Sequence, residues 1–243
     1  MHKREGLVLW SISIQRDPEH VQQLQAQFSN AAAGVLRCAL SVRHAAQEDP
    51  ASDLMSKFLH WCAAARDGRL EQTPELARHI VDSSPQYGVS FALQALSNAW
   101  ASSIPGLHWE SKPPGELERL RKIVYDSART ALAIDPKGVS GACAYWALAT
   151  VDDSTVGWAK RETFLQKALS LGPDAAAIYQ SYAQFLMRVG RFDEARAYFM
   201  RQANIEWSEA PIVQAAKLAA FGREINDGRD QFKEIKDKAL DSA

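Results

Sequence analysis

The stretch YQSYAQFLMRVGRFDEARAYF, from Tyr179 to Phe199, determines the expected fold more than any other part of this sequence. Two apolar runs, both containing aromatic residues and alanines, flank a short polar turn that contains Gly190. The apolar residues recur at the three- and four-residue spacings of one helix face. A glycine between two such runs is typical of a helix end. The stretch therefore predicts two short helices packed as an antiparallel hairpin.

The small residues of this stretch predict where its two helices cross. Ala183 lies in the first run and Ala195 in the second, so the helices can approach closely at these positions. We expect four aromatic residues to fill the space around the crossing: Tyr179, Tyr182, Phe192 and Phe199.

The chain beyond Pro50 is expected to form short helices joined by brief turns. Proline and glycine mark the breaks, as at 135–136 and 172–173. The expected helices span residues 52–66, 73–83, 87–102, 115–134, 138–151, 158–171, 175–189, 192–206, 209–222 and 228–241. The pattern is that of an all-α protein built from helix pairs.

The N-terminal part of the sequence differs from the rest. Residues 7–14 are rich in β-formers and predict one short strand, or an extended arm. Because a lone strand leaves its backbone groups unpaired, we expect it to pair between molecules or to pack as an irregular arm. From Pro18 to about Ala46 the pattern predicts a long amphipathic helix. We therefore expect an arm over residues 1–16 and a helical domain over 17–243.

A motif recurs at the ends of the predicted helices. An alanine, an apolar residue three positions later and a proline two further on occur at 131–136 and again at 168–173, so the prolines lie 37 residues apart. With the 179–199 hairpin, these residues resemble the tetratricopeptide repeat (TPR), whose period is 34. The best copy begins near Ala176, and 138–174 matches less closely. The resemblance implies a right-handed superhelix of antiparallel helix pairs.

A second resemblance concerns the segment LWSISIQRDPEHVQQLQAQFSNAAAGVLRCAL, Leu9 to Leu40. It is similar to the junction of bacterial regulators that join a TolB-like α/β domain to a TPR tail. The matching pairs are Leu9–Trp10, Arg16–Asp17 and Leu24–Gln25. The first repeat after that junction also resembles residues 51–92, although Phe58 stands where the family usually has a small residue.

The regulator family carries an N-terminal output module, either a winged-helix DNA-binding domain or a nucleotide cyclase. Neither module, nor most of the TolB-like portion, is found in this sequence. The resemblance thus implies the C-terminal sensory or interaction half of a transcriptional or signalling regulator.

Charge and cysteine usage limit the possible functions. The net charge is −1, from 28 basic and 29 acidic residues without a basic block, which argues against direct binding of nucleic acid. The three cysteines form no C-x-x-C pair, so we expect a reduced, intracellular chain. No apolar run reaches membrane-spanning length. Together these features predict a cytoplasmic protein that does not bind membranes.

The residues that could perform chemistry form no recognised site. His60 and Cys62 are two residues apart, on different faces of a helix, which does not suit a metal. Residues 152–154 resemble an acidic metal loop, but we interpret them as a turn and helix cap. The run Gly138–Cys143 lacks the lysine of a phosphate loop and follows a helix end instead of a strand. We expect no catalytic, cofactor-binding or metal-binding residues.

The binding site is expected on the inner face of the first helices, which line the concave groove of TPR arrays. In the best copy this face comprises Ala177, Gln180, Gln184, Met187 and Arg188. Chaperone-binding TPRs hold a carboxylate with Lys and Asn at such positions, whereas glutamines stand here. The prediction is therefore a noncatalytic scaffold that binds a protein or a neutral or mixed peptide. The alternative is a helical domain that senses a small molecule.

The tryptophans divide into two groups by their place in the pattern. Trp61, Trp100 and Trp146 have the spacing of helix core positions and are expected to pack in the interior. Trp109, in a proline-rich loop, and Trp207, at the end of a repeat, are candidates for exposed contacts with a partner.

Overall fold

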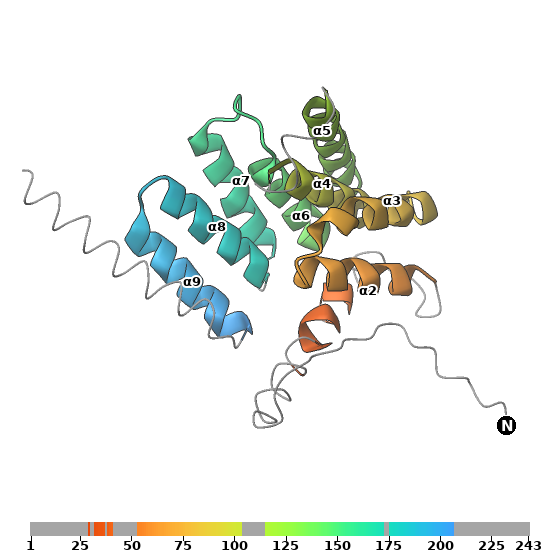
Figure 1. The fold of residues 1–243 in the computed structure, drawn as a ribbon, viewed down its shortest axis with the longest axis horizontal. Coiled ribbons are helices and arrows are strands. Elements are labelled where there is room, and N and C mark those ends of the chain that lie inside the picture. The colour runs from red at the N-terminus through yellow and green to blue at the C-terminus, as the bar shows by residue number, and fades with distance from the viewer. Residues whose placement is uncertain are drawn as a thin grey trace, which may run out of the picture. The chain divides into compact units, whose positions relative to one another are not determined.

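The computed structural model describes residues 53–103, 115–172 and 175–206, together with residues 29, 32–36 and 38–40. Within these residues the regular elements are all helical, and no strand occurs (Figure 1). Several expected features lie outside the described residues. They are the strand 7–14, the arm 1–16, the helices 209–222 and 228–241, Trp109 and Trp207.

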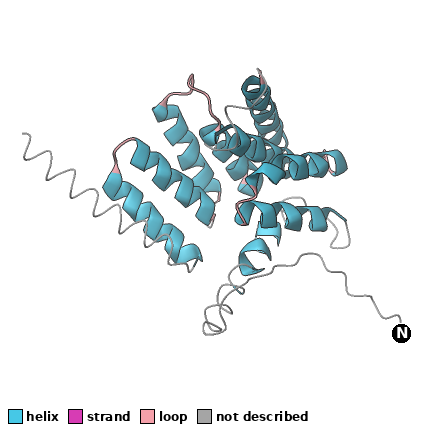
Figure 2. Ribbon diagram, in the orientation of Figure 1, coloured by secondary structure: helices cyan, strands magenta, loops and turns pink. Residues whose placement is uncertain are grey.

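The α-helices α2 to α9 begin and end within one residue of the predicted ones, whereas the short 3-10 helix η2 was not predicted. Figure 2 shows the described loops in pink. The elements are α2 Asp53–Arg66, η2 Leu70–Gln72, α3 Thr73–Ser83, α4 Gly88–Ser103, α5 Glu116–Ile134, α6 Gly138–Thr150, α7 Trp158–Leu171, α8 Ala176–Arg188 and α9 Phe192–Glu206. The all-α prediction is confirmed for this part of the chain. None of the described helices is long and apolar enough to cross a membrane.

The recurring proline motif ends two of the helices as its spacing predicts. The backbone N–H of Asp135 donates to the carbonyl of Ala131, and that of Gly172 donates to the carbonyl of Ala168, each at 2.9 Å. These bonds close the last turns of α5 and α7. The proline that follows has no N–H with which to continue the helix, so the chain turns into the next hairpin.

The chain divides into two compact units, Met1–Pro173 and Asp174–Ala243. In the first unit α4 contacts α3, α5 and α6, and α6 also contacts α5 and α7. A first helix of one hairpin therefore packs against both helices of the hairpin before it, which is how helical repeats bury a continuous core. The fully buried side chains of this core include Phe58, Ile80, Leu93, Leu96 and Val124.

The second unit consists, in its described part, of the hairpin α8–α9. Ala183 and Ala195 are both completely buried, as expected where the two helices cross. Tyr182 and Phe199 are 3% and 4% exposed and fill the adjoining space. Phe192, at the first position of α9, is only half-buried, so it contributes less to the crossing than the sequence suggested.

A disulfide joins Cys38 to Cys62, and the expectation of a fully reduced chain is therefore wrong for this pair. The bond links residues 38–40, which are helical, to α2. The bond was not predictable from the sequence, because the two cysteines are 24 residues apart and no C-x-x-C spacing marks them. Their proximity depends on helix packing, which the spacing alone does not reveal. Only Cys143 is a free cysteine among the described residues.

Candidate functional site

The residues expected to bind a partner lie on the solvent-exposed side of α8. Ala177, Gln180, Gln184 and Arg188 are exposed, and Met187 is half-buried. The three polar residues are spaced four apart, so they follow one another along one face of the helix. The opposite side of α8 is buried, with Ile178, Tyr182, Ala183, Phe185 and Leu186 in the interior. The structure thus brings the predicted polar residues together on one exposed stripe, here called the α8 stripe (Gln180, Gln184, Arg188).

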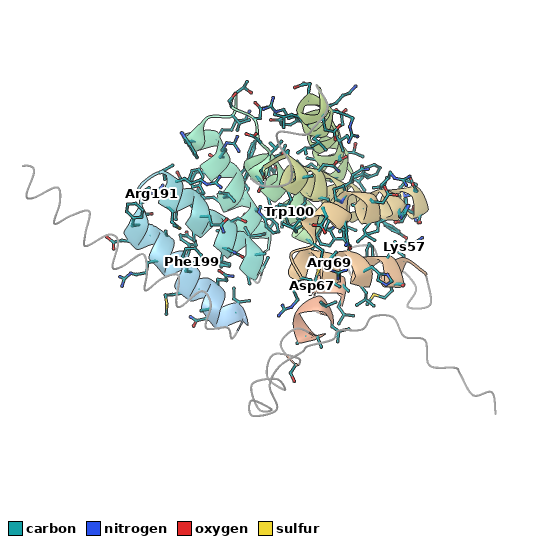
Figure 3. All side chains as sticks on the ribbon, in the orientation of Figure 1. Lys57, Asp67, Arg69, Trp100, Arg191 and Phe199 are labelled. Carbon is teal, nitrogen blue, oxygen red and sulfur yellow. A yellow bond between two sulfur atoms is a disulfide. The ribbon has the colours of Figure 1, made fainter. Side chains whose placement is uncertain are left out.

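Aromatic contacts between α8 and α9 hold the stripe in place. The Tyr182 and Tyr198 rings are 4.6 Å apart between centroids, and those of Tyr179 and Tyr198 are 6.0 Å apart. The guanidinium carbon of Arg201 lies 5.3 Å from the centroid of the Tyr198 ring, on its face. Phe199, labelled in Figure 3, is also buried on α9. Packing against α9 therefore holds the α8 backbone in place. The exposed side chains of α8 can contact a partner without backbone movement.

A left-handed glycine ends α8 next to Arg188. Gly190 has a φ of +80°, a backbone conformation that residues other than glycine rarely adopt. The N–H of Arg191 donates to the carbonyl of Leu186 at 2.9 Å, and that of Gly190 donates to the carbonyl of Met187 at 3.1 Å. This pair of bonds is a Schellman motif. Arg188 therefore stands in the last turn of α8, where its charge also favours the helix dipole.

Two first helices of the other unit, α2 and α6, each carry a tryptophan on their second half. Trp61 is the ninth residue of α2, Trp146 the ninth of α6 and Gln184 the ninth of α8. Trp61 and Trp146 are only 4% and 8% exposed. Both of these indoles are buried, whereas the carboxamide of Gln184 on α8 is exposed.

The three tryptophans expected to pack in the interior form a connected cluster. The Trp61 and Trp100 rings are stacked with centroids 5.7 Å apart, and Trp100 meets Trp146 edge-on at 5.3 Å. Trp100 is labelled in Figure 3. The indole N–H of Trp61 donates to the hydroxyl of Ser97 at 2.8 Å, which satisfies a buried donor. The cluster connects α2, α4 and α6. The prediction that these residues serve packing is confirmed, although Trp100 is only half-buried.

Arg161 organises the loop between α6 and α7, a role that the sequence did not predict. The Arg161 guanidinium donates to four backbone carbonyls, at distances between 2.6 and 3.1 Å. The acceptors belong to Ala149, Val151, Asp153 and Val156. Because the last carbonyls of a helix lack partners within it, this side chain caps the end of α6 and fixes the loop that follows.

Asp153 forms a turn within the same loop, as expected, but it does not cap a helix. Its carboxylate accepts hydrogen bonds from the hydroxyl and N–H of Thr155 and from the phenol of Tyr125. The N-terminal cap of α7 is Gly157, so the helix-cap interpretation of residues 152–154 is wrong. The tyrosine hydrogen bond and then that of Thr155 hold the pKa of Asp153 at about 2. Burial and the bond to Asp153 raise the pKa of Tyr125 to about 12.

The remaining chemical candidates show no arrangement for catalysis. Burial raises the pKa of the Cys143 thiol to about 12, so it carries almost no thiolate at neutral pH. Among the described side chains, no group of three or more His, Cys, Asp and Glu residues is placed to hold a metal ion. His60 is exposed on α2.

Trp158, at the start of α7, is 55% exposed. The sequence did not predict this exposed aromatic residue.

Comparison with known proteins supports the fold. The structure is similar to the crystal structure of a thermophilic TPR protein from Thermus thermophilus, with a TM-score of 0.53 and 18% sequence identity. The similarity covers 82% of this chain and 95% of that protein. No protein-family model and no curated protein matches the sequence. At this identity the likeness concerns the fold alone, and it shows that this chain has a TPR-like fold.

Proposed function

We propose that this chain is a noncatalytic scaffold that binds a peptide or protein segment on the α8 stripe. The observation that carries the proposal is the placement of Gln180, Gln184 and Arg188 on one exposed helix face above a fully packed hairpin. TPR-like folds commonly present the first helix of each pair to a partner, in a concave groove.

The chemistry of the stripe indicates the kind of partner. Each glutamine carboxamide both donates and accepts hydrogen bonds, so Gln180 and Gln184 can pair with the N–H and C=O groups of an extended peptide. Arg188 adds one guanidinium, which pairs with a carboxylate on the same segment. Ala177 and the half-buried Met187 border the stripe with small and apolar contacts. The partner of best fit is a mostly neutral segment with one acidic group.

Surface side chains on a packed helix are replaceable without loss of the fold, which makes the proposal testable. The triple variant Gln180→Ala, Gln184→Ala and Arg188→Glu should fold normally and lose at least about tenfold in affinity for the binding segment, because interface arginines contribute strongly to binding. The segment is first identified by screening an array of short peptides against the purified chain.

The matched control is Arg196→Glu, an exposed charge reversal on α9 outside the α8 stripe. It changes the net charge as much as Arg188→Glu does. A comparison of the two therefore distinguishes the loss of a local contact from a general effect of net charge on binding. If Arg196→Glu lowers the affinity for the binding segment as much as the triple variant does, the α8 stripe is not the binding site.

We further infer that the scaffold belongs to a bacterial transcriptional or signalling regulator, as its interaction half. The support is the resemblance of Leu9–Leu40 to the junction between a TolB-like domain and a TPR tail. If the inference holds, the chain should bind a purified winged-helix or cyclase output domain of a regulator from that family. Isothermal titration of the two purified proteins tests this, and an absence of binding heat would count against it.

A further inference from the structure

We propose that the Cys38–Cys62 disulfide is a redox-controlled latch that holds the helical residues 32–36 and 38–40, here called the segment, against α2. The segment and the helix contact each other at two places. The position of a Cβ on Gly34 would overlap the guanidinium of Arg66, and Cys38 is bonded to Cys62. From the first contact to the second, the residue number rises along the segment and falls along α2. The two helices therefore run antiparallel.

The face that the latch covers is apolar. In the segment, Val35 and Ala39 are completely buried, while Leu36 and Leu40 are 47% and 50% exposed on the other side. One face of the segment therefore packs and the other meets solvent.

On α2, the contacting residues Cys62 and Arg66 are four positions apart, on one face of the helix. Cys62 is only 2% exposed. Release of the segment would expose Cys62, and on the segment Val35 and Ala39, to water, which is unfavourable for apolar surface.

The two cysteines differ in exposure, since Cys38 is half-buried and Cys62 is 2% exposed. We infer that the reductant attacks from the side of Cys38. The proposed reductant is a dithiol. Its thiolate attacks the Sγ atom of Cys38, the S–S bond breaks, and Cys62 leaves as a thiolate that takes up a proton.

The second thiol of the reductant then completes the reaction. It attacks the mixed disulfide, becomes joined to the first reductant sulfur, and releases Cys38 as a thiol. Two electrons and two protons pass from the dithiol to the protein, and the dithiol becomes a disulfide. Reduction removes the covalent link, so the segment is then held only by its buried face, Val35 and Ala39.

The first experiment establishes the bond. The full chain is denatured without reductant and treated with iodoacetamide, and the number of alkylated cysteines is read by mass spectrometry. We expect one modified cysteine, Cys143. Three modified cysteines in protein prepared under oxidising conditions would overturn the proposal.

The second experiment measures the latch. Hydrogen exchange of residues 29–40 is compared in the oxidised protein and after treatment with dithiothreitol. Reduction should accelerate exchange in this segment on the order of tenfold, while α4 to α7 keep their protection. The double variant Cys38→Ser, Cys62→Ser should exchange at the fast rate with or without reductant. Cys143→Ser is the control and should respond to reductant as the unaltered chain does.

Two outcomes would contradict the latch. Equal exchange in the segment before and after reduction would show that packing alone holds it. Loss of protection throughout α4 to α7 on reduction would show that the disulfide supports the whole fold and is no local latch.

Discussion

The phenol of Tyr125, on α5, donates a 2.6 Å hydrogen bond to Oδ2 of Asp153, in the loop between α6 and α7. The two residues are 28 positions apart and belong to successive hairpins. Asp153 is 9% exposed, so its carboxylate depends on these protein partners in place of water. Arg121 strengthens the same junction, because its Nε donates to the carbonyl of Asp152 at 2.5 Å. The α6–α7 loop is thus fastened to the preceding hairpin.

Replacement of Tyr125 by phenylalanine should destabilise the chain by about 1–3 kcal/mol, because a hydrogen bond to a charged group is lost and the carboxylate remains buried. Urea unfolding followed by circular dichroism measures the change. Tyr179→Phe is the matched control, since no hydrogen bond of the Tyr179 hydroxyl occurs within the described residues. A change no larger than that of the control would refute the stabilising role of this bond.

The same pair predicts a pH dependence whose sign follows from the two pKa values. The pKa of Asp153 is lowered to about 2, so its contribution is present above the ordinary value of 3.8 and is lost as the pH falls towards 2. The pKa of Tyr125 is raised to about 12, so its contribution is present below 10.0 and is lost as the pH rises towards 12. The free-energy difference between the unaltered chain and Tyr125→Phe, measured by urea unfolding across the pH range, should be constant between these limits. It should shrink below about pH 4.

Arg161→Lys should cost about 2 kcal/mol of stability, although the charge is kept. A lysine ammonium cannot reach the four carbonyls that the planar guanidinium bonds at once. Arg129→Lys, at an exposed ion pair with Asp126, is the control and should change stability by no more than about 0.5 kcal/mol. Equal midpoints of urea unfolding for the two variants would show that Arg161 does not organise the loop.

The α8–α9 crossing predicts a further contrast between two alanines of one helix. Ala183→Leu should destabilise the chain by roughly 1–3 kcal/mol, because the larger side chain overpacks a fully buried position against α9. Ala177→Leu makes the same chemical change on the exposed side of α8 and should leave the melting temperature nearly unchanged. Equal melting temperatures for the two variants would contradict the repeat register.

The helices were predictable because local patterns determine them. Proline and glycine mark their ends, as Pro136 and Gly190 do, and apolar residues recur at helical spacing between these breaks. The small residues Ala183 and Ala195 also predicted the crossing, because the side chains at a close contact must be small wherever two helices meet.

The features that escaped prediction depend on residues that are distant in sequence. The four acceptors of Arg161 are carbonyl groups, and every residue type has one, so no sequence pattern marks them. The partners Cys38 and Cys62 become neighbours only when two helices pack together. For the α8 stripe, the sequence predicted which residues are exposed, but the partner's identity does not follow from exposure.

The most direct test of the proposed binding face is site-specific photo-crosslinking. Gln184, at the centre of the α8 stripe, is replaced by a photo-reactive phenylalanine analogue, and the same residue is placed at the exposed Arg196 of α9 as the control. The chain is irradiated with the peptide selected from the array, and the product is sequenced by mass spectrometry. We expect a crosslink from position 184 and none from position 196. A crosslink from position 196 with none from 184 would contradict the proposal that the α8 stripe binds the partner.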